Sequence, residues 1–166
     1  MRPFFARLRK ALPSPRVAFA GAALWGGVMG ANAVILLSRQ LEWQAEPRAL
    51  LLGALFALGG ALAFPAGHFM QALVARNARA ETRFSAAFLA FAIATLAITA
   101  ALYAMQYRLY YAQWHGAFLS PSWIIHFVFT TAGALYQFAV LGLRIYFPWG
   151  LAALFALSLV YAVRPR

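Results

Sequence analysis

The placement of its charged residues constrains this chain more than any other feature of the sequence. Only 10% of the residues are charged and 64% are apolar, and the charges stand in short clusters between long uncharged apolar runs. A helix needs about 20 apolar residues to cross the roughly 30 Å hydrocarbon core of a bilayer. We therefore expect an all-α integral membrane protein.

The apolar runs predict a compact bundle of five transmembrane helices, or of four if the last run does not cross. The predicted spans cover about residues 17–37, 49–74, 84–107, 122–143 and 145–163. The last run contains no charged residue, so hydropathy favours five spans. No other segment is long enough to build a second core, and we expect residues 17–166 to form one domain.

Residues 1–16 form a separate basic segment on the cytoplasmic side of the first span. Its basic residues are Arg2, Arg7, Arg9, Lys10 and Arg16. Phe4, Leu8 and Leu12 recur at helical spacing between them. This pattern predicts a short amphipathic helix on the membrane surface, which Pro13 and Pro15 interrupt.

The basic residues also predict the orientation of the chain. Cytoplasmic loops carry the excess of lysine and arginine. With the N-terminus in the cytoplasm, that side holds nine of the 14 basic residues for five spans, and eleven if the last run is re-entrant. The five-span arrangement places Arg166 outside. Abundant alanine and a single lysine suggest a GC-rich bacterial genome, so we expect a multi-pass protein of the bacterial inner membrane.

Small residues four positions apart predict where helices touch. Gly26 and Gly30 have this spacing in the first span, and Gly59, Ala63 and Gly67 have it in the second. Such faces let two helix backbones approach closely, which favours association inside lipid. The pattern fits a neighbouring helix of this chain and a helix of another protein equally.

The fourth predicted span carries a polar stripe. His126, Thr130, Gln137 and Arg144 recur at steps that keep them on one helix face. A lesser stripe in the third span consists of Thr95, Thr99, Tyr103 and Gln106. Polar groups in lipid usually face the interior of a bundle. The stripe predicts either a polar pathway or, as we favour, hydrogen bonds between helices.

Arg144 ends this stripe, where the chain must turn toward the last run. We predict that it anchors the span at the cytoplasmic interface, where it contacts anionic lipid headgroups. Glu81 is the only acid predicted on that side, so it is the expected ion-pair partner of Arg144.

Three histidines raise the question of a haem or metal site. His68 is predicted near the inner face and His126 near the outer face, so one haem cannot bind both. His115 and His126 are predicted to approach each other at the outer surface, near Glu42 or Glu46. No spacing typical of a metal motif supports a site there. We therefore expect no cofactor, with haem or a metal at His115 and His126 as the alternative.

The residue inventory argues against catalysis and against nucleic-acid binding. None of the three acids, Glu42, Glu46 and Glu81, lies inside an apolar run, and cysteine is absent. The predicted spans therefore contain no carboxylate and no thiol, which leaves little from which to build a general acid–base pair. The basic residues lie at the ends of apolar runs, where contact with headgroups explains them.

We expect a small non-enzymatic accessory or assembly subunit of a larger membrane complex. Its predicted partners are the lipid bilayer with its anionic headgroups and other membrane subunits or further copies of itself. One alternative is a small homo-oligomeric transporter with a polar path along the fourth span. The other is a haem- or quinone-binding redox membrane protein that uses the outer histidines.

Overall fold

The computed structural model describes residues 8–40, 46–75 and 77–163, and these are helical almost throughout, with no strand among them. The longer helices are α2 (Pro15–Gln40), α3 (Glu46–Ala75), α4 (Ala80–Tyr111), α5 (Pro121–Gln137) and α7 (Trp149–Val163). The short elements are η2 (Ala112–Trp114), the π-helical η3 (Phe138–Gly142) and α6 (Leu143–Ile145). The predicted all-α fold is confirmed.

Four helical segments are long and apolar enough to cross a membrane. They are Pro15–Arg39, Ala49–Ala75, Ala80–Trp114 and Pro121–Ile145, while α7 is a shorter apolar helix. The first seven residues of the predicted surface helix lie outside the described part of the chain. Positions 8–11, which belong to the same predicted helix, are helical.

Two prolines that were predicted to interrupt the chain mark the beginning of α2. Pro15 is its first residue, a position where the missing N–H costs nothing because the first helical N–H groups have no partner in the helix. The Ser14 hydroxyl accepts a hydrogen bond from the backbone N–H of Val17 at 3.4 Å. The helix therefore begins slightly before the predicted span.

Small residues allow α2, α3 and α4 to pack closely. A Cβ added to Gly26 would lie 2.6 Å from the carbonyl oxygen of Ala57, and one added to Gly67 would lie 2.7 Å from the Phe91 ring. Gly30 faces α3 in the same way as Gly26, and Gly59 lies against Thr99 of α4. Both glycine-containing faces therefore contact helices of this chain.

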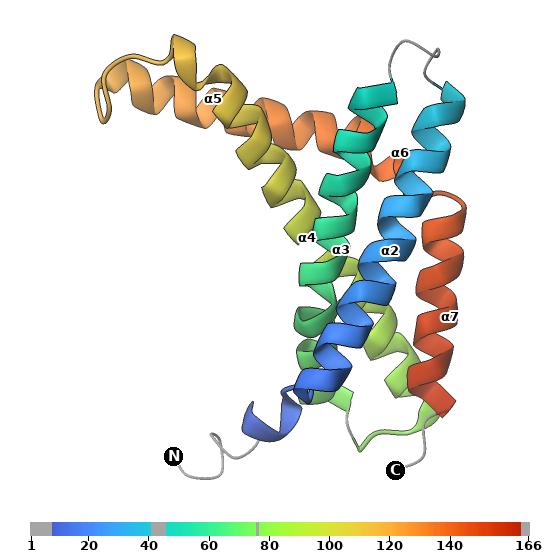
Figure 1. The fold of residues 1–166 in the computed structure, drawn as a ribbon. Helices are drawn as coiled ribbons and strands as arrows, with labels where there is room; N and C mark the ends of the chain where they lie inside the picture. The colour runs from blue at the N-terminus through green and yellow to red at the C-terminus, as the bar shows by residue number, and fades with distance from the viewer. Residues whose placement is uncertain (1–7, 41–45, 76, 164–166) are drawn as a thin grey trace.

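The first turn of α2 and the last turn of α7 lie at the same end of the bundle (Figure 1). Tyr161 near the end of α7 contacts Arg83 near the start of α4, and the Tyr146–Gly150 turn before α7 lies beside Asn32 of α2. This arrangement differs from the five-span expectation, which placed the chain ends on opposite sides. Residues 164–166 lie outside the described part of the chain.

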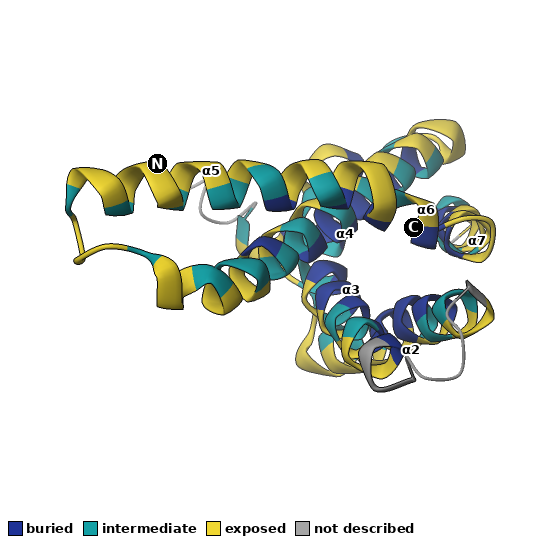
Figure 2. Ribbon diagram, turned by 90° about the horizontal axis from the view of Figure 1, so that it is seen from above, coloured by how far each residue is buried: buried dark blue, intermediate teal, exposed yellow. Residues whose placement is uncertain are grey.

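The difference arises because α5 lies across the bundle instead of along it. Figure 2 shows α2 and α3 nearly end-on, whereas α5 is seen lengthwise. In Figure 1, α4 tilts away from α3 and α5 returns to the end of the bundle where α2 finishes and α3 begins. The end of α4 together with α5, residues 103–137, forms a projection that we call the arm.

The small face of α3 leads to a prediction about bulk. Ala63 is completely buried, whereas Ala54 on the same helix is exposed. Ala63→Leu should destabilise the protein by about 1–3 kcal/mol, because added bulk forces closely packed helices apart. Thermal unfolding in detergent measures this cost, with Ala54→Leu as the matched control. Equal losses in the two variants would show that α3 has no special packing face.

Candidate functional site

The residues of the predicted polar stripe do not bond to one another through their side chains, and each has its own local surroundings. The Gln137 side-chain oxygen accepts a hydrogen bond from the Tyr103 hydroxyl at 3.1 Å, which joins α5 to α4. The Thr130 hydroxyl donates to the carbonyl of His126 at 2.6 Å, within α5 itself. The His126 side chain is exposed. Of these groups, only Gln137 makes a hydrogen bond between helices.

Arg144 lies at the opposite end of the bundle from the one predicted. In the η3 turn the backbone N–H of Leu143 bonds to the carbonyl of Phe138, five residues earlier. A π turn holds one extra residue, which rotates everything after it by roughly a quarter turn. Arg144 consequently lines a pocket beside Leu36 and Leu37, near the end of α2.

The predicted ion pair between Arg144 and Glu81 is therefore wrong. Glu81 lies in the first turn of α4, at the end of the bundle where α2 begins. Arg144 lies at the other end, because α5 runs across the bundle and does not return the chain to the first end.

The pocket around Arg144, which we call the end pocket, has a volume of about 320 Å³. Tyr103, Gln137 and Arg144 supply its polar side chains. The remaining lining is apolar and comes from Leu36, Leu37, Leu52, Phe56, Phe138, Leu141, Gly142 and Ile145. Ligand pockets commonly combine an apolar wall with a few convergent polar groups, and the end pocket has this composition.

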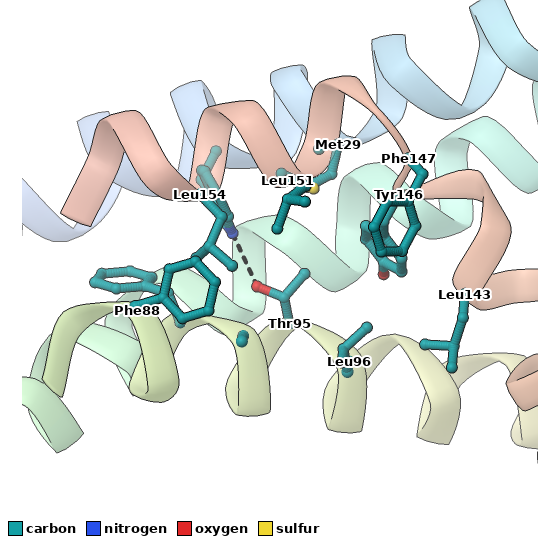
Figure 3. A pocket seen from close by; sticks show the side chains of 13 residues that line it. Met29, Phe88, Thr95, Leu96, Leu143, Tyr146, Phe147, Leu151 and Leu154 are labelled. Carbon is teal, nitrogen blue, oxygen red and sulfur yellow. Dashed lines mark hydrogen bonds between the residues drawn. The ribbon is translucent and has the colours of Figure 1, made fainter. Parts of the chain in front are cut away.

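A second pocket of about 290 Å³, the lateral cleft, lies between α4 and α7 with α2 behind it (Figure 3). The rings of Phe84 and Phe155 also join α4 to α7, at a centroid distance of 5.1 Å. At the base of the cleft the Trp25 indole donates to the Thr95 hydroxyl at 3.0 Å. The surface of the cleft is apolar, which suits a hydrocarbon chain.

The structure brings His115 and His126 together near the tip of the arm. Their ring centroids lie 5.5 Å apart. Glu42 and the side chain of Glu46, which were predicted nearby, lie outside the described residues. Among the described residues no group of three or more His, Cys, Asp and Glu side chains is arranged to hold a metal ion. His68 is far away and contacts the Tyr161 hydroxyl at 2.7 Å.

Arg83 holds the end of α7, a role that the sequence did not reveal. Its Nε and Nη2 atoms donate to the carbonyl oxygen of Tyr161 at 3.0 and 2.5 Å. The last carbonyls of a helix have no partner within it, and a cation is favourable at that end. Arg83 directly precedes the predicted third span, which begins at residue 84, and it lies inside α4.

Asn32 plays a matching part at the other end of α7. Its side-chain nitrogen donates to the carbonyl of Ile145 at 2.5 Å, just before the turn into α7. Asn32 is 5% exposed. The sequence did contain a signal for this contact. Asn32 is a single amide inside an apolar run, and a polar group in that position requires a hydrogen-bond partner.

Comparison of the chain with protein-family models, curated proteins and solved structures finds no match.

The contact between Arg83 and α7 predicts that lysine cannot replace this arginine. Lys has a single ammonium group and cannot reproduce the planar pair of donors. Arg83→Lys should cost about 1–2 kcal/mol of stability and speed hydrogen exchange at the end of α7. Exchange measured by mass spectrometry tests this, with exposed Arg79→Lys as the control. Unchanged exchange in Arg83→Lys would contradict the assigned role.

Proposed function

We propose that this protein is a small non-catalytic accessory or assembly subunit of a larger complex in a bacterial inner membrane. We further propose that the arm is the surface that packs against an apolar transmembrane segment of another protein. The observation that carries the proposal is the low burial of α5. Only 11% of the most apolar stretch in Pro121–Ile145 is buried, compared with 44% for Pro15–Arg39.

The distribution of side chains around α5 supports this role. Gln137 at the end of α5 faces α4, through the hydrogen bond to Tyr103. Large apolar side chains point away from the chain, and Phe129 and Tyr136 are 72% and 70% exposed. Exposed apolar patches of this kind mark contact with lipid or with another protein.

The direction of α5 favours a protein partner over lipid alone. With α2 and α3 along the membrane normal, α5 lies along the membrane plane (Figure 1). A helix in that position normally buries one apolar face and turns a polar face toward water. The side chain of Gln137 is turned to α4, and most of the large exposed side chains of α5 are apolar, with Ser122 and His126 exposed near its beginning. A partner helix would cover these apolar side chains.

The positions of the basic residues support a cytoplasmic N-terminus. Ten of the 14 fall in three stretches of sequence. The first runs up to the start of α2, the second runs from the end of α3 to the start of α4, and the third follows α7. These ten are Arg2, Arg7, Arg9, Lys10, Arg16, Arg76, Arg79, Arg83, Arg164 and Arg166. By the positive-inside rule, this distribution supports a cytoplasmic location for the end of the bundle where α2 begins.

The two other functions considered from the sequence have weaker support. A transporter path along α5 would need polar groups that line a common space, but Gln137 and Thr130 bond in different directions. A haem or metal at His115 and His126 would have two protein ligands among the described residues. An absorption spectrum of the purified protein tests the haem alternative directly.

A change of bulk on α5 tests the docking surface. Ala132 on α5 and Ala156 on α7 are both exposed, so tryptophan at either position leaves the core intact. Ala132→Trp should reduce recovery of the partner roughly tenfold, the effect of about 1.4 kcal/mol. Ala156→Trp should leave recovery unchanged. The measurement is quantitative mass spectrometry of the complex purified in mild detergent.

Two results would refute the proposal. If the wild-type protein purifies with no other protein in fixed stoichiometry, it is not an accessory subunit. If a stable partner is recovered equally with both variants, the arm is not the docking surface. Self-association alone would favour the homo-oligomeric alternative.

A further inference from the structure

The end pocket combines one cation, Arg144, with an apolar wall. Arg144 is exposed and makes no salt bridge with any residue in the described part of the chain. A guanidinium presents a planar set of donors that matches the paired oxygens of a phosphate or carboxylate. The charge at this pocket therefore selects an anionic group.

Gln137 adds a second donor beside Arg144. Its side-chain oxygen is occupied by the Tyr103 hydroxyl at 3.1 Å, which fixes the orientation of the amide. The amide nitrogen lies 3.5 Å from the Tyr107 hydroxyl, a long contact that uses at most one of its two N–H groups. The other N–H has no acceptor among the described residues, so it remains available to a ligand.

The apolar part of the end pocket lies near the end of α2, a candidate membrane span, and therefore near the level expected for lipid headgroups. Leu36 and Leu37 line it, and α2 ends at Gln40, only about 5 Å further along the helix axis. Leu141 from η3 lies on the same wall. A ligand that fills the pocket thus needs an anionic group joined to hydrocarbon.

We propose that the end pocket binds one anionic membrane phospholipid. Its phosphate contacts the guanidinium of Arg144 and the free amide N–H of Gln137, and its acyl chains lie on the leucine wall. This site is separate from the outward face of α5 that we assign to a protein partner. The proposal therefore stands or fails independently of the docking role.

Lipid titration of the purified full-length protein tests the site. The probes are phosphatidylglycerol and phosphatidylcholine with identical eight-carbon chains, together with octanoate, and native mass spectrometry counts the bound molecules. The wild-type protein should retain one phosphatidylglycerol per chain in preference to phosphatidylcholine. Arg144→Gln should lower the affinity for phosphatidylglycerol roughly tenfold or more.

The control is Arg39→Gln, which removes the same charge from an exposed position in the last turn of α2, outside the pocket lining. It should leave phosphatidylglycerol binding unchanged. Equal losses in both variants would show general surface attraction and overturn the site. Equal affinity of the wild-type protein for both phospholipids would exclude recognition of the charge. Tighter retention of octanoate than of phosphatidylglycerol would show that the site takes a carboxylate and not a phospholipid.

Discussion

The close contact of α3 with α2 and α4 is the constraint on which the rest of this structure depends. In a bilayer the hydrophobic effect does not drive helices together, so close packing and hydrogen bonds must hold them. Gly26 and Gly67 provide the approach, and the buried rings of Phe56 and Phe91 fill the space beside it. Because these three helices are fixed, the tilt of α4 is fixed as well. That tilt opens the lateral cleft beside α7 and carries the arm out of the bundle.

The short helix α7 depends on polar contacts at both of its ends. Its 15 residues extend about 22 Å, which is less than the roughly 30 Å of a hydrocarbon core. Asn32 bonds to the Ile145 carbonyl before it, and Arg83 bonds to the Tyr161 carbonyl near its end. These contacts satisfy carbonyls that would be costly to leave unpaired in lipid. They also fix the position of the turn before α7. This turn lies next to the end pocket, and Arg144 is part of the pocket lining.

The sequence predicted the helical segments well and their directions less well. Charge placement located α2, α3 and α4 to within a few residues, because charged residues mark where a helix can leave lipid. Apolarity alone cannot distinguish α5, which lies across the bundle, from a helix that runs along it. The π turn at Phe138–Gly142 has no clear sequence signal and was not predicted. The pairing of His115 with His126 followed from chain connectivity, whereas the contact between Arg83 and Tyr161 required the three-dimensional arrangement.

The central claim is that α5 lies across one end of the bundle, so that α2 begins and α7 ends together at the opposite end. Reporter fusions to the N-terminus and to the C-terminus measure this directly, using an enzyme that is active only outside the cytoplasm and a fluorescent protein that is active only inside. Together with the proposed cytoplasmic N-terminus, this arrangement predicts that both termini report the cytoplasm. Termini on opposite sides would show that α5 crosses the membrane, and the arrangement described here would be wrong.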